Sequence, residues 1–334
     1  MSTTDSTRTS ILLVARPVGM VDETSFDTVT RPIPALQPGE VLVRNLFVSC
    51  DPYLRLRMAE GFALDEPVVA RAVGEVIAST DSRFTPGDLV WGFLTWETHS
   101  IARAEQLYLV DPSHGPISHA ISVRGMIGLT AWIGMLDLGR PQPGDTVLVS
   151  TAAGAVGSVA GQLARLAGAR VVGIAGGERK VRHCLDFLGY DAAIDYKADT
   201  PLDETISSAC PDGVDVYFDN VGGEILDTVI GHLRVGARLA MCGNVASYNE
   251  PEEEHGIRLG RLLGSQATMT WFSINDHMDE LPGYIERMAP LVSSGKVVYR
   301  EDIAQGFDAV IDSFLGLYRG ENLGKQLVQV AERS

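Results

Sequence analysis

The stretch Val147-Leu-Val-Ser-Thr-Ala-Ala-Gly-Ala-Val-Gly157 decides the fold class of this chain. It runs from apolar strand residues through a turn of small residues into an apolar helix. Gly154 and Gly157 keep the spacing of a GxGxxG turn, with Ala152 in the place of the first glycine. Such glycines let the backbone approach a pyrophosphate closely, and the following helix N-terminus offers it free N–H groups. The stretch predicts a dinucleotide-binding turn; the alternative is a tight turn that binds nothing.

The surroundings of this turn indicate a doubly wound parallel sheet. After about residue 121, short apolar runs alternate with helix-length segments such as Val156–Leu166 and Gly222–Leu233. This alternation is typical of βαβ units, in which helices cover both faces of the sheet. The predicted strands are Thr146–Ser150, Arg170–Ala175, Asp191–Ile194, Val214–Phe218 and Arg238–Met241.

The part of the chain before residue 121 has the pattern of an all-β unit. The run Val41–Val48 follows a Pro-Gly turn, and Val73–Ala78 precedes the segment Phe84–Trp91, which contains another. Short β-rich runs divided by such turns favour a barrel-like domain. The C-terminal run Gln326–Val330 is also strand-like, and the sequence leaves open whether it rejoins this first domain.

Composition narrows the class of protein. The 334 residues carry 27 Lys and Arg against 43 Asp and Glu, a net charge of −16. We therefore expect neither a nucleic-acid partner nor an anionic membrane surface, since an acidic surface repels both. The four cysteines stand far apart, without a CxxC pair, which favours a reduced compartment. The polar start has no signal-peptide pattern, and no apolar run approaches the roughly 20 residues of a spanning helix. We expect a cytoplasmic protein.

The end of the second predicted strand bears on the choice of cofactor. An NAD site places an acid about 20 residues past the glycines, where it binds the ribose hydroxyls. Here Gly176 and Gly177 end the strand, and Glu178-Arg-Lys180 follows. The glycines leave room for a 2′-phosphate that Arg179 or Lys180 can neutralise, so the sequence favours NADPH. Glu178 could mimic the NAD acid, but an acid is favoured at a helix start in any case.

Six segments in order resemble one known family. Together they span residues 49 to 325, nearly the whole chain. They are Ser49-Cys-Asp-Pro-Tyr-Leu-Arg55, Gly128-Leu-Thr-Ala131, Ala152-Ala-Gly-Ala-Val-Gly157, Phe218-Asp-Asn-Val-Gly-Gly223, Cys242-Gly-Asn-Val-Ala-Ser-Tyr-Asn249 and Glu321-Asn-Leu-Gly-Lys325. The chain is similar to the zinc-independent medium-chain dehydrogenase/reductases, in the group of prostaglandin, 2-alkenal and curcumin reductases.

The resemblance implies an α/β fold of two domains. A GroES-like, partly open β-barrel domain would comprise residues 1–123 and 293–334, and a Rossmann-type doubly wound domain residues 124–292. It also implies an NADPH-dependent reduction of the carbon–carbon double bond of enals and enones, and a homodimer. The cofactor contacts that it implies are Thr130, Gly154, Ala155, Val156, Gly157, Gly177, Lys180, Tyr196, Asn220, Cys242, Gly243, Asn244, Tyr248, Phe272, Ser273, Ile274 and Asn322.

We expect no metal. A catalytic zinc needs Cys and His ligands with an open fourth position. Cys50 lies near the place of a first cysteine ligand in zinc-dependent relatives, but the stretch Ala70–Glu75 supplies no histidine, and a cysteine-rich structural lobe is missing from the sequence. Without a Lewis acid, the chemistry favours hydride addition to an already polarised enone.

Three side chains are candidate donors to the enolate oxygen that forms during such a reduction. Tyr248 and Tyr53 can donate as neutral phenols. Asn275 stands where some relatives have a tyrosine, and its amide can donate a hydrogen bond without acting as an acid. We expect Tyr248 to matter most; Tyr53 can equally be a packing residue, and a ribose hydroxyl of the cofactor is a further donor.

Two other functions remain open at this point. One is a quinone reductase of the same superfamily, which delivers the hydride to a quinone. The other is a protein that binds the cofactor with little catalysis. Comparing the turnover of an enal with that of a benzoquinone distinguishes a quinone reductase from an enone reductase. Tight binding of NADPH without turnover of either substrate indicates a cofactor-binding protein.

Overall fold

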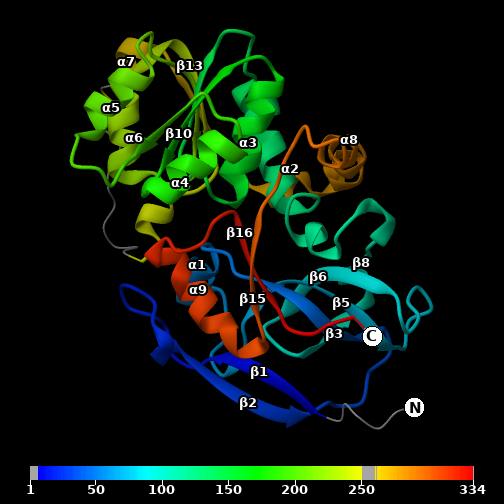
Figure 1. The fold of residues 1–334 in the computed structure, drawn as a ribbon. Helices are drawn as coiled ribbons and strands as arrows, with labels where there is room; N and C mark the ends of the chain where they lie inside the picture. The colour runs from blue at the N-terminus through cyan, green and yellow to red at the C-terminus, as the bar shows by residue number, and fades with distance from the viewer. Residues whose placement is uncertain (1–6, 250–259, 261, 334) are drawn as a thin grey trace. The chain divides into compact units, whose positions relative to one another are not determined.

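A computed structural model describes residues 7–249, 260 and 262–333, which form two compact units (Figure 1). Of these residues, unit 1 comprises 7–121, 302–322 and 326–333, and unit 2 comprises 122–249, 260, 262–301 and 323–325. The α/β class expected from the sequence is confirmed, with one mixed and one parallel sheet. The domain limits drawn from the resemblance, 1–123 with 293–334 and 124–292, stay a prediction.

Unit 2 is built on a six-stranded sheet in the order β11-β10-β9-β12-β13-β14, and neighbouring strands in it run parallel. Its strands are β9 (Thr146–Val149), β10 (Arg170–Ala175), β11 (Ala192–Asp195), β12 (Val214–Asp219), β13 (Leu233–Met241) and β14 (Thr268–Trp271). The strand order reverses between β9 and β12, which is the point where doubly wound sheets bind their ligands.

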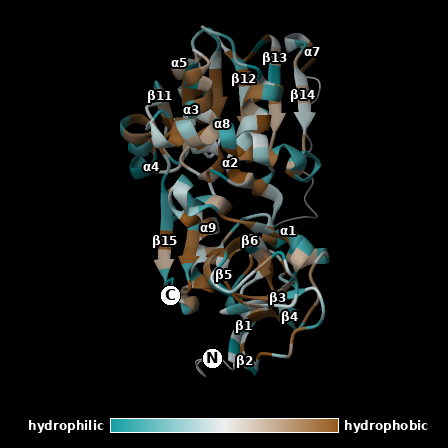
Figure 2. Ribbon diagram, turned by 90° about the vertical axis from the view of Figure 1, so that its right-hand side faces the viewer, coloured by the Kyte–Doolittle hydropathy of each residue, from teal (hydrophilic) through white to brown (hydrophobic). Residues whose placement is uncertain are grey.

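Helices and short turns connect these strands. They are α2 (Met126–Trp132), the wide turn η5 (Ile133–Gly139), α3 (Ala155–Leu166), α4 (Glu178–Arg182) with its continuation η6 (His183–Phe187), α5 (Leu202–Ala209), α6 (Gly223–Ile230), η7 (Val245–Ser247), α7 (Leu262–Ser265), η9 (Ile274–Glu280) and α8 (Leu281–Ser293). Strands β9, β10 and β12 are buried along most of their length. This burial accounts for their nearly continuous apolar sequences. Figure 2 colours the chain by hydropathy, and hydrophobic residues are prominent in β12.

Two differences from the sequence prediction concern the far side of this sheet. The predicted helix Gly222–Leu233 ends at Ile230, and β13 already begins at Leu233 rather than at Arg238. Residues 233–236 are more exposed than the rest of β13, so they lacked the apolar signal that marks a buried strand. The edge strand β14 was missed for the same reason, because two of its four residues are exposed.

Unit 1 contains a three-stranded sheet, β2-β1-β4, and a seven-stranded sheet, β15-β16-β3-β5-β6-β8 with β7 paired to β3. The strands are β1 (Thr7–Leu13), β2 (Phe26–Pro32), β3 (Glu40–Ser49), β4 (Glu66–Pro67), β5 (Val69–Ser79), β6 (Leu89–Thr95), β7 (His99–Arg103), β8 (Leu107–Leu109), β15 (Glu301–Gln305) and β16 (Lys325–Gln329). Helices α1 (Leu54–Glu60) and α9 (Val310–Arg319) complete the unit. The C-terminal run does rejoin the first domain, since Leu327 pairs with Ser49.

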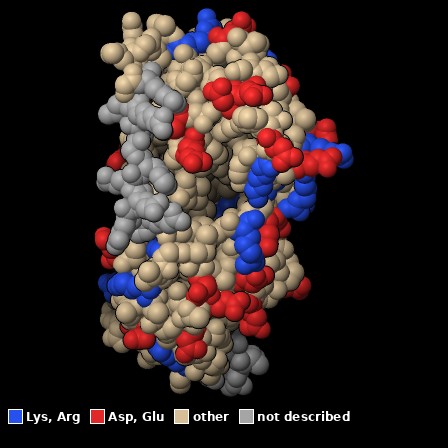
Figure 3. Space-filling view, turned by 90° about the vertical axis from the view of Figure 1, so that its left-hand side faces the viewer, with Lys and Arg blue, Asp and Glu red and all other residues tan. Residues whose placement is uncertain are grey.

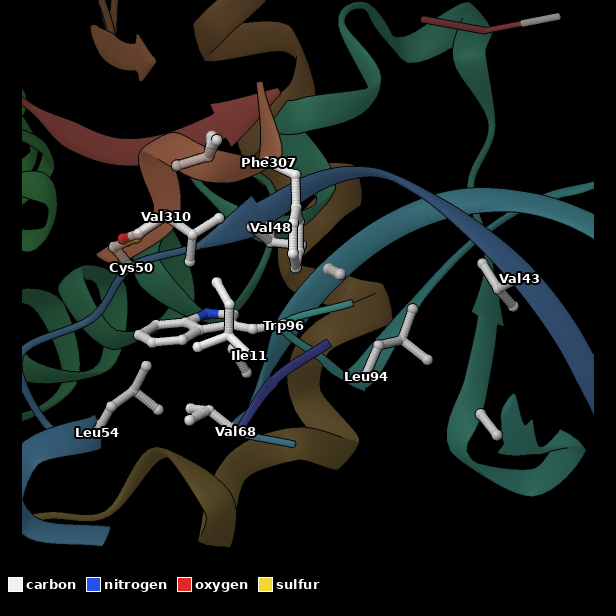
Figure 4. Close-up of a cluster of buried hydrophobic side chains, with 14 of the residues drawn as sticks. Ile11, Val43, Val48, Cys50, Leu54, Val68, Leu94, Trp96, Phe307 and Val310 are labelled. Atoms are coloured by element: carbon white, nitrogen blue, oxygen red, sulfur yellow. The ribbon is translucent and has the colours of Figure 1, made fainter. Parts of the chain in front are cut away.

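The core of unit 1 is one hydrophobic cluster between these strands and α9. Trp96 lies at its centre, fully buried, with its indole N–H donating to the Ser49 carbonyl at 3.2 Å (Figure 4). Phe314 of α9 meets the Trp96 ring edge to face, with centroids 5.3 Å apart. Trp96 is therefore a core residue.

The outer surface carries charges of both signs. On the face of Figure 3, acidic side chains are spread widely and basic ones stand beside them. Among the described residues, no helix combines the length and the apolar character that crossing a bilayer requires.

Candidate functional site

The predicted phosphate turn lies between β9 and α3. Thr151 takes the left-handed backbone conformation, with φ of 50°, so the strained position is one residue before Ala152, which stands in the first-glycine place. A Cβ atom at Gly154 would lie 2.6 Å from Thr151 Cγ2, and one at Gly157 would lie 3.0 Å from the Thr151 carbonyl carbon. Glycine is therefore required at both positions. Helix α3 starts without a side-chain cap, which leaves the N–H groups at its start free for a phosphate.

A tyrosine that sequence reasoning missed holds this turn in place. Tyr190 is buried, and its hydroxyl donates to the Gly157 carbonyl at 2.6 Å. Its ring lies where a Cβ atom at Gly173 would be 2.9 Å from Cδ2, and Gly161 is equally closed to a side chain by the hydroxyl. Glycines on α3 and β10 thus make the space that the tyrosine fills. The spacing of these glycines is visible in the sequence. Their partner Tyr190 lies 33 residues from Gly157, so the sequence does not connect it with them.

The ends of β10 and β11 form the predicted ribose-phosphate region. Gly177 has φ of 87° and open space where a side chain would lie. Its N–H donates to Asp195 Oδ1 at 2.8 Å, and the Lys197 N–H donates to the same oxygen at 2.9 Å. The Tyr196 ring is 47% exposed, with Lys197 Nζ 5.8 Å from its centroid. Lys180 follows on α4, half-buried.

Both acids of this region have partners. Asp195 Oδ1 accepts the two backbone N–H groups, and the exposed Glu178 pairs with Arg182 at 2.5 Å on α4. The basic and aromatic groups near Gly177 are Lys180, Tyr196 and Lys197. Lys197 is an addition to the residues singled out from sequence, where it had no motif to mark it.

Asn220 is fixed by a buried polar cluster at the switch point of the sheet. Its backbone N–H donates to Ser150 Oγ at 2.8 Å, and its Nδ2 donates to the Ser150 carbonyl at 2.7 Å. Asp219 Oδ1 accepts from Ser150 Oγ at 3.0 Å and from the Tyr217 hydroxyl at 2.8 Å. Burial raises the pKa of the Asp219 carboxyl. This arrangement turns the Asn220 Oδ1 acceptor away from Ser150.

The predicted nicotinamide residues after β13 lie next to Asn220. A Cβ atom at Gly243 would lie 3.2 Å from both the Asn220 carbonyl oxygen and the Tyr248 hydroxyl. The Tyr248 hydroxyl accepts the Asn244 N–H at 3.4 Å, which leaves its own proton available. Burial raises the pKa of the Tyr248 phenol, and it raises that of the Cys242 thiol to about 12. Both groups are neutral near pH 7.

The residues after β14 meet α2 and η5. Phe272 lies over Gly134, where a Cβ atom would be 2.8 Å from the ring. Ser273 and Ile274 continue into η9, which packs against α2. The Thr130 hydroxyl on α2 donates to the Met126 carbonyl at 2.6 Å. Asn275 is exposed on η9.

Two of the predicted site residues belong to unit 1. Tyr53 precedes α1, and burial raises the pKa of its phenol. Asn322 is half-buried between α9 and β16. The other predicted residues all lie in unit 2, at or beside the carboxyl ends of its strands or on α2.

Among the described residues, no three His, Cys, Asp or Glu side chains gather in a way that suits a metal ion. Cys50 is buried, and its thiol donates to the Val310 carbonyl at 3.7 Å. The expectation that the protein works without a metal stays a prediction.

Comparison with known proteins agrees with this geometry. Residues 9–110 match the family described as the N-terminal domain of oxidoreductase, and residues 155–290 match the one described as zinc-binding dehydrogenase. YfmJ of Bacillus subtilis, named as an NADP-dependent oxidoreductase, is 43% identical over 97% of this chain and 98% of its own length. The 2-alkenal reductase (NADP(+)-dependent) of Nicotiana tabacum is 39% identical, over 88% of each chain.

The crystal structure of CurA from Vibrio vulnificus in complex with NADPH matches with a TM-score of 0.91 and 36% identity, over 97% of this chain and 99% of that one. The chain belongs to the medium-chain dehydrogenase/reductases. The matches to YfmJ and to the alkenal reductase place it with the alkenal, curcumin and prostaglandin reductases of that family, as the sequence resemblance implied. In this reductase, the turn that was predicted to bind the nucleotide precedes α3 in unit 2, and its contacts with NADPH stay a prediction.

Proposed function

We propose that this reductase uses NADPH to reduce the carbon–carbon double bond of α,β-unsaturated aldehydes and ketones. The similarity to the 2-alkenal reductase over 301 residues carries the proposal. The use of NADPH as the cofactor follows from the NADP-dependent relatives and from the NADPH complex of CurA.

The residues of unit 2 fit this cofactor. The glycines at 154 and 157 keep the turn free of side chains, so the first N–H groups of α3 face a pyrophosphate. At the end of β10, Gly177 leaves open space, and Lys180 and Lys197 are the cations near it in sequence that could neutralise a 2′-phosphate. Asp195 Oδ1 accepts two backbone N–H groups and Glu178 pairs with Arg182, so both acids near this position have partners of their own.

Bound NADPH supplies a hydride, and we expect this hydride to add to the β-carbon of the enone. Negative charge then develops on the carbonyl oxygen, and a donor aimed at that oxygen stabilises the transition state. The α-carbon then takes a proton from solvent, which completes the saturated carbonyl product. Tyr248 is the first candidate, because its proton is free and its hydroxyl stands beside the Cys242–Asn244 turn. Its raised pKa keeps it a neutral donor. Tyr53 and Asn275 are the alternatives.

A substrate panel tests the reaction. An enal, a methyl enone and a benzoquinone are each incubated with NADPH carrying deuterium at C4, and the products are analysed by mass spectrometry and NMR. We expect the enal and the enone to be turned over, with deuterium on the β-carbon of a saturated carbonyl product. Deuterium on the carbonyl carbon, or turnover of the quinone alone, contradicts the proposal.

Hydroxyl deletions test the donor. Tyr248→Phe keeps the ring, so we expect turnover to fall while NADPH affinity changes little. Loss of one oxyanion donor costs about 10²–10³ in rate where no other group replaces it, and a smaller fall is expected here because a ribose hydroxyl shares the role. Tyr108→Phe is the matched control, since Tyr108 is exposed and stacked on Trp91. Full turnover in Tyr248→Phe, with a large loss in Tyr53→Phe or Asn275→Ala, would move the role to that residue.

A further inference from the structure

Arg71 is a buried cation that lacks a partner among the described residues. Its side chain belongs to a residue that is 6% exposed, and its Nε atom is sealed from solvent without an acceptor. Within the part of the chain that the structure describes, it makes neither a hydrogen bond nor an ion pair. Buried charges in proteins are ordinarily paired, so a guanidinium left in this state calls for a functional explanation.

Two aromatic rings hold the guanidinium. Its Cζ atom lies 5.5 Å from the Tyr53 centroid and 5.3 Å from the Phe93 centroid. Phe93 is the cross-strand neighbour of Arg71, on β6, and Tyr53 comes from the loop before α1. Stacking offsets part of the cost of burying the charge, but it leaves the N–H donors of the guanidinium free.

The neighbouring acids do not neutralise Arg71. Glu75 lies further along β5 on the same face of the strand as Arg71, because every second side chain of a strand points to the same side. It forms its ion pair with Arg44, at 2.8 Å. Tyr53 is not a counter-ion either, because burial raises the pKa of its phenol and keeps it neutral. Asp51 accepts the Ser49 hydroxyl and makes no ion pair with Arg71.

The other buried arginine of this unit shows what a structural role looks like. Arg55 is 1% exposed, and its terminal Nη2 donates to the carbonyls of Pro17 and Gly19 at 3.0 and 2.9 Å. It ties a loop to α1. Arg71 does not connect two segments in this way. Its planar guanidinium can donate two parallel hydrogen bonds to a carboxylate.

We propose that Arg71, between Tyr53 and Phe93, binds a carboxylate carried by the substrate, so that the enzyme prefers enones with a remote carboxylate over neutral ones. This inference rests on the proposed function, because Tyr53, whose ring Arg71 contacts, is one of the candidate donors to the enone. The net charge of −16 gives the protein no general attraction for anions, so a local cation has to supply the selectivity.

The test uses a series of methyl enones that end in a carboxylate, with methylene spacers of increasing length, each paired with its methyl ester. In the wild type, we expect kcat/KM for the acid to exceed that for the ester at one or more spacer lengths. Arg71→Met should lower kcat/KM for the acid by roughly tenfold to a hundredfold, the effect of one charge-assisted contact, and leave the ester within about twofold. Arg71→Lys should keep part of the preference, because it retains the charge without the fork.

Arg83→Met is the matched control. Arg83 also lies over a ring, that of Phe84 at 5.9 Å, but it is exposed and paired with Asp81 at 2.9 Å. In Arg83→Met, we expect the ratio of kcat/KM for the acid to kcat/KM for the ester to equal that of the wild type. Melting temperatures of all variants show whether they are folded.

The proposal is overturned if the wild type shows no acid preference at any spacer length, or if folded Arg71→Met loses acid and ester activity alike. A second measurement does not depend on turnover: the saturated acids and esters are added as thermal-shift probes. Stabilisation by an acid, but not its ester, in the wild type and its loss in Arg71→Met support the site even if no enone is reduced, which would refute the proposed function alone. No difference between acid and ester contradicts the site.

Discussion

Gly157→Ala tests the nucleotide turn most directly. The added Cβ atom would lie 3.0 Å from the Thr151 carbonyl carbon and 3.1 Å from Ala152 Cα, both rigid backbone atoms, and closer still to the Thr151 oxygen. The turn must therefore open by about half an ångström or more. Overpacking of this kind costs about 1–3 kcal/mol, and alanine returns about 1 kcal/mol of helix propensity. We expect a net loss of about 0–2 kcal/mol in stability and a melting temperature lower by a few degrees.

The effect on the cofactor is expected to be larger. Opening the turn misplaces the N–H groups at the start of α3, and each charge-assisted contact to phosphate contributes about 1.5–3 kcal/mol. We expect fluorescence titration to show NADPH and NADH weakened by the same factor, roughly tenfold or more, because both carry the pyrophosphate. The control is Gly283→Ala, in α8, where a Cβ atom meets nothing within 4 Å. Wild-type affinity for both cofactors in folded Gly157→Ala would refute the reasoning.

Three further outcomes are expected. Lys180→Ala should weaken NADPH by roughly tenfold or more and NADH little, since a 2′-phosphate contact is lost; equal losses in fluorescence titrations would exclude Lys180 from that role. Exhaustive chelation should leave turnover unchanged, and stoichiometric zinc at Cys50 in elemental analysis would show that a metal is present. The Cys242 thiol, with its pKa raised to about 12, should react with iodoacetamide about a hundredfold or more slower than a free cysteine at about pH 8, and faster as pH rises, because only the thiolate reacts. Rapid labelling at that pH would contradict this environment.

Local sequence patterns were sufficient where the physics is local. The turn from Val147 to Gly157 could be read because a strand, small residues and an apolar helix follow one another within a few residues. Strands β10 and β12 were found because burial on both faces makes them continuously apolar. The partly exposed β14 has no such signal, and its place at the edge follows from pairing with β13.

The tertiary structure decided how those pieces meet. The left-handed residue of the turn is Thr151, and Gly157 packs against its carbonyl, which the spacing of the glycines does not indicate. Ser150 and Asn220, 70 residues apart, are joined because the strand order reverses between β9 and β12.

Sequence by itself thus determined the family and the cofactor class and predicted the nucleotide turn, since these depend on short contiguous motifs. It had no means to single out Tyr190, Asp219 or Arg71. In the sequence, these three residues do not differ from other tyrosines, aspartates and arginines. They are distinguished by their burial and by the residues around them in the fold. Those neighbours come from distant segments, so only the folded chain shows that Tyr190 and Asp219 have partners and that, among the described residues, Arg71 has only two aromatic rings.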